Sequence, residues 1–146
     1  MNILSDEYFM KKAFDEAEKA KGENEVPVGA VIVSNNIVIA KAHNQVEALN
    51  DPTAHAEILA ITSATNYLGS KYLEKCTLYV TLEPCMMCAS ALNWAKIDRI
   101  VYAAEDPKNG FMKCGKQVLH PKTKLEFGLM RDKSSEMLKA FFQNKR

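Results

Sequence analysis

The sequence predicts an α/β fold, a three-layer αβα sandwich built around a central mixed sheet of five strands. Segments with helical periodicity alternate with short β-rich runs, which is typical of helices packed over a mostly parallel sheet. The chain has 146 residues, 47% of them apolar, and no repeat or Pro/Gly/Ser-rich linker interrupts it. We therefore expect residues 1–146 to form a single domain.

The first expected elements are a helix and a hairpin. Residues 6–21 place apolar side chains at spacings of three and four, and Ser5 is available as N-cap. Residues 26–33 and 37–42 are β-rich runs. The Asn35-Asn36 pair between them tolerates the positive φ values of a tight turn, so we expect the two strands to be antiparallel neighbours.

The remaining elements follow from composition and alternation. Helices are expected where Ala, Leu and Met predominate, and strands where β-branched residues alternate with others. This places helices at residues 53–65, 85–95 and 134–144, and strands at 77–82, 98–104 and 125–129. Trp94 and Tyr102 are expected to be packing residues, and at least one of the neighbours Phe141 and Phe142 should be buried.

The composition also limits where the protein works. The longest apolar stretch, at residues 26–33, is far below the roughly 20 residues that cross a bilayer. Asp6 and Glu7 stand where a secretory signal would be apolar. We therefore expect a cytoplasmic protein without a membrane partner, whose four cysteines are thiols or metal ligands rather than disulfides.

Charge is distributed unevenly along the chain. Residues 1–107 carry nine basic and 15 acidic side chains, whereas residues 108–146 carry ten basic and three acidic ones. A basic end on a near-neutral chain suits a phosphate-bearing partner, because attraction depends on the local surface rather than on the total charge. The alternative is that the terminal lysines only improve solubility.

Two short motifs carry the strongest chemical signal, His55-Ala56-Glu57 and Pro84-Cys85-Met86-Met87-Cys88. One imidazole and two thiols suit zinc, and three protein ligands leave the fourth tetrahedral position open for water, which indicates catalysis. His55, Cys85 and Cys88 are therefore candidate metal ligands. Glu57 is a candidate proton carrier, because a carboxylate beside an activated water can pass protons to a ring nitrogen and to departing ammonia.

A C-x-x-C pair alone has other interpretations. It could form half of a structural zinc site or a thioredoxin-like redox pair. The upstream His-x-Glu and the proline directly before Cys85 favour a catalytic zinc site, and together they match the pattern of zinc deaminases that act on nucleobases.

Longer segments around these motifs resemble the cytidine and deoxycytidylate deaminase superfamily, and most closely its bacterial tRNA-specific adenosine deaminases. The superfamily resemblance is carried by DPTAHAEILAI at 51–61 and TLYVTLEPCMMCASAL at 77–92. The closer resemblance is carried by VPVGAVIV at 26–33, AHN at 42–44, EDPKNG at 105–110, LHPKT at 119–123 and the ending MLKAFFQNKR. The likeness covers nearly the whole chain and implies a cytidine deaminase-like fold.

The resemblance implies zinc-dependent, hydrolytic conversion of adenosine to inosine at the wobble position of a tRNA anticodon loop. It further implies a homodimer with one Zn²⁺ per subunit. Matched residue by residue, His55, Cys85 and Cys88 would hold the zinc, Glu57 would move protons, and Asn44 would hydrogen-bond the target base. A single-stranded loop suits this chemistry because its bases are extruded at least cost.

The resemblance also gives the basic end a role and leaves an alternative substrate. The closing helix would lie against the phosphates of the anticodon stem-loop, with Lys145 and Arg146 as the expected contacts. The segment WAKIDRIVYAA at 94–104 is also similar to guanine deaminases. Deamination of a free base or nucleoside, such as guanine or cytosine, is therefore the alternative function, and a non-catalytic zinc-bearing RNA-binding protein is a third.

Overall fold

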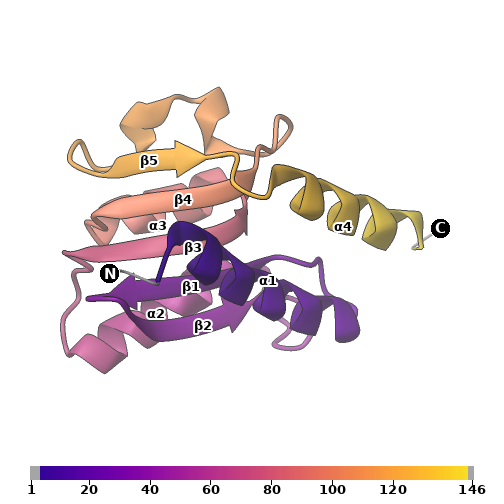
Figure 1. Ribbon diagram of the computed structural model, residues 1–146, viewed down its shortest axis with the longest axis horizontal. Helices are drawn as coiled ribbons and strands as arrows, with labels where there is room; N and C mark the ends of the chain where they lie inside the picture. The colour runs from indigo at the N-terminus through magenta and orange to yellow at the C-terminus, as the bar shows by residue number, and fades with distance from the viewer. Residues whose placement is uncertain (1–3, 145–146) are drawn as a thin grey trace.

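The computed structural model describes residues 4–144 and contains the predicted succession of helices and strands (Figure 1). In chain order the elements are α1 (Asp6–Gly22), β1 (Gly29–Ser34), β2 (Ile37–His43), α2 (Ala56–Leu68), β3 (Cys76–Leu82), α3 (Met86–Trp94), β4 (Arg99–Ala104), the 3-10 turns η1 (Phe111–Lys113) and η2 (Lys116–Val118), β5 (Lys124–Phe127) and α4 (Arg131–Gln143). Within the described residues, no helix has the length and apolar character that crossing a membrane requires.

The five strands form one mixed sheet in the order β2-β1-β3-β4-β5, which confirms the predicted sheet. Strands β3, β4 and β5 are parallel, and β1 pairs antiparallel with β2 across the predicted hairpin. The structure adds a second antiparallel pair, β1 with β3. This pair arises because β2 and β3 run in the same direction, joined through α2 by a crossover connection, and β1 lies between them.

Helices cover both faces of the sheet, as the three-layer prediction requires (Figure 1). Neighbouring residues of β1 point to opposite faces: Val31 packs with α1, and Ile32 packs with α2 and α3. Met137 of α4 belongs to the same cluster as the apolar face of α1. The layers are therefore α1 with α4, the sheet, and α2 with α3.

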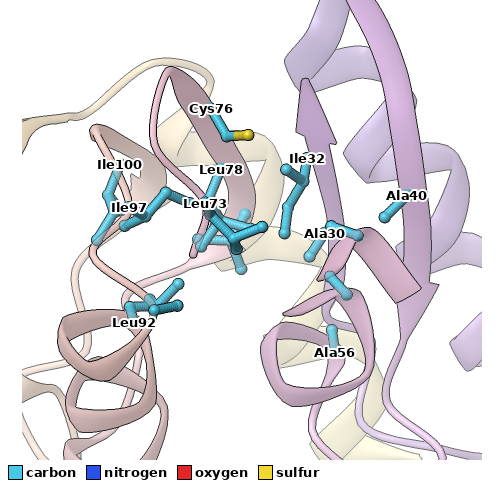
Figure 2. Close-up of a cluster of buried hydrophobic side chains, with 14 of the residues drawn as sticks. Ala30, Ile32, Ala40, Ala56, Leu73, Cys76, Leu78, Leu92, Ile97 and Ile100 are labelled. Carbon is cyan, nitrogen blue, oxygen red and sulfur yellow. The ribbon is translucent and has the colours of Figure 1, made fainter. Parts of the chain in front are cut away.

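The layer of α2 and α3 rests on small side chains, which lets α2 approach the sheet closely. Ala56, Ala60 and Ala64 recur every four residues on α2 and are fully buried. They belong to a cluster with Ala30 and Ala40 of the sheet, part of which Figure 2 shows together with Leu92 of α3. This packing determines where the first turn of α2 lies.

Element boundaries differ from the predictions where side chains redirect the backbone. The second helix begins at Ala56 rather than at Thr53, because the Asp51 carboxylate accepts hydrogen bonds from the Thr53 N–H and hydroxyl, both at 2.8 Å. Asn35 and Asn36 adopt the expected positive φ values of 54° and 63° in the hairpin turn.

The aromatic side chains follow the predictions with one exception. Tyr102 is 1% exposed and Phe141 is 8% exposed, whereas Phe142 points outward. The prediction that Trp94 packs in the interior is wrong, because Trp94 is 83% exposed. Leu92 lies on the buried face of α3, and a residue two positions later points to the opposite side of the helix.

Candidate active site

A cleft opens at the edge of the sheet where β2, β3 and β4 end and β1 begins. Strands β2, β3 and β4 run in one direction, and β1 runs in the opposite direction. The segments after β2, β3 and β4 therefore meet the segment before β1 at this edge. Figure 1 shows α4 extending beyond the same edge. The cleft has a volume of about 1430 Å³, and its walls comprise residues 23–26, 28, 44, 46–47, 55, 57, 82–83, 85–87, 105–109, 138 and 141–142.

The three predicted metal ligands converge at this cleft: His55 and Cys85 line it, and Cys88 is buried beside them. His55 is the N-cap residue of α2, Cys85 is the N-cap residue of α3, and Cys88 lies in the first turn of α3. His55 Nδ1 is 3.6 Å from Cys85 Sγ and 3.6 Å from Cys88 Sγ, and all three atoms lie within 4.8 Å of one another. Ligand atoms around a tetrahedral zinc ion lie roughly 3.4–3.8 Å apart, so the cluster fits one zinc ion.

The cluster carries a negative charge that favours binding of a cation. Hydrogen bonds from Cys88 and His55 lower the pKa of the Cys85 thiol to about 4, so this sulfur is a thiolate at neutral pH. The hydrogen bond that each makes with Cys85 raises the pKa of the Cys88 thiol and the pKa of the His55 imidazole. A thiolate beside a thiol and an imidazole is the donor set that zinc binds with release of protons.

Glu57 lies beside the cluster without joining it. It is in the first turn of α2, is 4% exposed and lines the cleft. Burial raises the pKa of its carboxyl group to about 7, and the group interacts with Cys88. Among the described residues, the set able to hold a metal comprises only His55, Cys85 and Cys88, so this carboxyl group is left for other chemistry.

Asn44 joins the end of β2 to the start of α2. Its Oδ1 accepts a hydrogen bond of 2.8 Å from the backbone N–H of Ala56. The N-cap residue of α2, His55, makes no capping hydrogen bond with its own side chain, so Asn44 caps the helix in its place. The imidazole of His55 is thereby available to the cluster. Asn44 also lines the cleft, and its amide NH₂ is the polar group that remains for a ligand there.

Some basic side chains near the C-terminus form contacts within the protein itself. Arg131, the first residue of α4, donates two hydrogen bonds to the carboxylate of Glu105, at 2.7 and 2.9 Å. The ammonium group of Lys133 lies 4.8 Å from the centre of the Phe14 ring. Lys139 remains exposed on α4. Lys145 and Arg146, the expected RNA contacts, lie outside the described residues.

Sequence reasoning missed several residues of the cleft. Leu138 and Phe142 reach it only because α4 extends across the sheet edge, which no local pattern indicates. Glu25 and Glu83 are buried carboxylates on its walls, 2% and 5% exposed. The signal that could have identified both glutamates is their position next to strand ends at the edge where a ligand binds in folds of this class.

Comparisons with known proteins agree with this geometry. The tRNA-specific adenosine deaminase of Aquifex aeolicus (strain VF5) is 46% identical over 148 residues, covering 98% of this chain and 97% of that protein. A solved tRNA:A34 deaminase, described for A-to-I editing at the wobble position of transfer RNA, is 42% identical with a TM-score of 0.84, covering 90% of this chain and 99% of the other. A solved guanine deaminase from Bacillus subtilis is 43% identical with a TM-score of 0.66, covering 72% and 66%.

A family model of the cytidine and deoxycytidylate deaminase zinc-binding region matches residues 4–104, a span that contains the whole His/Cys/Cys cluster and Glu57. The match agrees with a mixed five-stranded sheet that carries one zinc-compatible cluster at its edge. The chain therefore belongs to the cytidine and deoxycytidylate deaminases and, within them, to the tRNA-specific adenosine deaminases.

Proposed function

We propose that this protein catalyses the zinc-dependent, hydrolytic deamination of adenosine to inosine at the wobble position of a tRNA anticodon loop. The observation that carries the proposal is the cluster of His55, Cys85 and Cys88 at a cleft that His55, Cys85 and the buried Glu57 line. The identity of 46% with a tRNA-specific adenosine deaminase, over nearly the full length of both chains, supports the choice of substrate.

The positions of the residues support the following roles. His55, Cys85 and Cys88 hold the zinc, which when bound supplies activation of water for attack on the base. Glu57 takes a proton from the attacking water and delivers protons to the ring nitrogen and to the leaving ammonia. The new C6–O bond replaces the C6–N bond, so the net reaction consumes water and releases ammonia. Asn44 binds the target base through its amide NH₂.

The size of the cleft supports a substrate larger than a single base. Its volume of about 1430 Å³ exceeds the roughly 300–1,000 Å³ of common small-ligand pockets. An extruded adenine and its neighbouring nucleotides therefore have room beside Leu138 and Phe142 of α4. The alternative, a deaminase of free guanine or cytosine, has weaker support, because the similarity to the B. subtilis guanine deaminase covers only 66% of that chain.

The anticodon stem-loop is proposed to bind along α4 and the cleft rim. Lys108 lines the rim and Lys139 is exposed on α4, so both are placed to contact phosphates. Lys145 and Arg146 extend the same basic end and are proposed as further contacts. A tRNA substrate supports a cytoplasmic location, and residues 1–146 are proposed to act as one domain.

We also propose a homodimer with one zinc site per subunit, formed through the outer face of α3. This helix contains no charged residue, and Met86 and Trp94 on its outer face are 42% and 83% exposed. An uncharged, apolar helix face of this kind is typical of the core of a protein interface. Met86 also lines the cleft, so a second copy packed there would border the active site.

The decisive experiment is incubation of the protein with an anticodon stem-loop RNA, followed by sequencing for adenosine-to-inosine changes at the wobble position. Parallel reactions with free adenosine, guanine and cytosine are measured by ammonia release. We expect inosine in the stem-loop and strong inhibition by added salt. An unmodified stem-loop together with ammonia release from guanine or cytosine would contradict the proposal.

The matched variant for this experiment is E57Q, which keeps the size of the buried side chain and removes its ionisation. We expect its kcat to fall about a hundredfold or more, with zinc content and thermal unfolding unchanged. Full activity of zinc-loaded E57Q would rule out Glu57 as the proton carrier.

A further inference from the structure

Two buried carboxylates outside the catalytic cluster hold the loops that form the sides of the cleft. Glu25 precedes β1 and Glu83 follows β3, so both lie at the edge of the sheet where the cleft opens. Each is almost completely buried. Burying a carboxylate costs free energy unless hydrogen bonds satisfy its oxygens. The groups that donate these hydrogen bonds therefore show which part of the structure each carboxylate holds.

Glu25 holds the loop between β2 and α2. Its Oε1 accepts a hydrogen bond from the backbone N–H of Glu47 at 3.1 Å, and its Oε2 accepts one from the N–H of Ala48 at 2.8 Å. Val46 and Glu47 of this loop line the cleft. Both oxygens of one carboxylate are thus committed to one wall.

Glu83 holds the loop after β4 in the same manner. Its Oε1 accepts from the N–H of Asp106 at 2.9 Å, and its Oε2 accepts from the N–H of Met112 at 3.0 Å. The carboxylate occupies the space that a Cβ atom on Gly110 would need. An isolated antiparallel β-bridge between the backbones of Cys85 and Gly110 connects the loop to the start of α3.

The two loops form opposite walls. In the strand order β2-β1-β3-β4-β5, one loop follows β2 and the other follows β4, while β1 and β3 lie between them. Cys85, which comes shortly after β3, therefore lies between the walls. Each carboxylate thus joins one wall to the sheet edge at which the metal cluster lies.

We propose that Glu25 and Glu83 are positioning residues that hold the two walls ready for the nucleotides flanking the extruded base, so that they govern recognition of the RNA loop rather than the chemistry. This inference rests on the proposed function, because it assigns the walls to a polynucleotide. Walls that are held before binding lose less conformational entropy when the RNA loop enters.

The test compares E25Q and E83Q with the wild type and with E18Q, which removes an equal charge at an exposed position on α1. Glutamine keeps one acceptor but presents an NH₂ group to the second backbone N–H. We call the two hydrogen bonds that each of these carboxylates accepts from a cleft wall a clamp. For the clamp variants E25Q and E83Q we expect KM for the stem-loop to rise about tenfold, with kcat within about twofold and zinc content unchanged. We expect E18Q to match the wild type.

Amide hydrogen exchange tests the clamps without any substrate. We expect E25Q to accelerate exchange at Glu47 and Ala48 alone, and E83Q to accelerate exchange at Asp106 and Met112 alone. Unchanged exchange, unchanged KM, or a fall in kcat accompanied by zinc loss in these variants would overturn the inference. A wild-type protein that leaves the stem-loop unmodified would instead overturn the proposed function, and the exchange rates would still decide whether the clamps exist.

Discussion

The side chain of Asn44 connects the architecture of the protein to its proposed chemistry. Its Oδ1 caps α2 through the Ala56 N–H, and the residue lines the cleft beside the metal cluster. A capping oxygen and a donating NH₂ group belong to the same amide, so the residue that caps the helix is also the one proposed to bind the ligand. A substitution that keeps the accepting oxygen but removes the donating NH₂ group can distinguish the two roles.

We predict that N44D keeps the cap but loses the donor, whereas N44A loses both. The stability of N44D should match that of the wild type, because a carboxylate at a helix N-terminus also accepts the Ala56 N–H. N44A should be less stable by about 1 kcal/mol. Both variants should lose about tenfold or more in kcat/KM. Urea unfolding and stem-loop deamination measure the two effects, and an active N44D would contradict the base-binding role.

At the scale of elements, the contact between α1 and β1 depends on Gly29. An added Cβ at this position would fall on the backbone of α1, at the carbonyl oxygen of Ala13 and the amide nitrogen of Ala17. Gly29 is the first residue of β1, which begins at the cleft edge. The absence of a side chain there allows the helix to lie directly on the strand.

We predict that G29A destabilises the protein by about 3 kcal/mol, because backbone atoms of α1 cannot move aside as a flexible side chain can. The matched control is G22A at the end of α1, where nothing lies within 4 Å of an added Cβ. G22A should be neutral or slightly stabilising. Equal unfolding midpoints for the two variants in urea would show that the close approach does not exist.

The start of α1 is attached to the sheet by a polar network centred on Asp6. Arg99 of β4 donates two hydrogen bonds to its carboxylate, at 2.9 and 2.7 Å, and the Tyr79 hydroxyl donates a third at 2.6 Å. The bonds from Arg99 hold the pKa of Asp6 below its ordinary value of 3.8. Because the folded-state pKa is lowered, this stabilisation is present above about pH 4 and is lost as the pH falls through the folded-state value.

We predict that D6N lowers the free energy of unfolding by about 1 kcal/mol at pH 7, since the pair is partly exposed and solvent screens it. The difference from the wild type should shrink as the pH falls below about 4, because wild-type Asp6 is then protonated as well. E7Q, in the same helical turn, is the control. Urea unfolding from pH 2.5 to 7 measures the effect, and a constant difference across this range would contradict the prediction.

At the scale of the whole molecule, the most exposed large apolar side chain in the described residues is Trp94. The outer face of α3 exposes it together with Met86, which lines the cleft. A second subunit on this face would bury apolar area and border the active site. Dimer formation is therefore expected to contribute to activity as well as to stability.

We predict that W94D weakens self-association at least about tenfold, because a buried tryptophan often dominates an interface and a charge there is costly to desolvate. The monomer should keep its fold, since the side chain is 83% exposed. I37D, at an exposed position on the edge strand β2 rather than on α3, should leave association unchanged. Sedimentation velocity over a concentration series measures this, and equal association of wild type and W94D would exclude α3 as the interface.

The sequence by itself determined the order of the elements, the hairpin turn and the ligand cluster. Helical periodicity, β-rich runs and the Asn35-Asn36 pair are local signals, and local conformation follows from neighbouring residues. The spacing of Cys85 and Cys88 places both thiols at one helix start, and the His-x-Glu motif completes a set whose chemistry is specific. Residue type and short spacing were sufficient for the elements and the turn, whereas the meeting of His55 with two thiols 30 and 33 residues away was inferred from the match to the zinc deaminase pattern.

Tertiary structure alone decided the β1–β3 pairing, the exposure of Trp94, the capping of α2 by Asn44 and the clamps formed by Glu25 and Glu83. Each depends on contacts between segments that are distant in the sequence, and no short-range pattern encodes such contacts. The strand-end positions of Glu25 and Glu83 mark them as candidates for the cleft, but only the fold shows that each is buried against the N–H groups of another loop. The positions of the cleft walls are therefore a property of the folded chain.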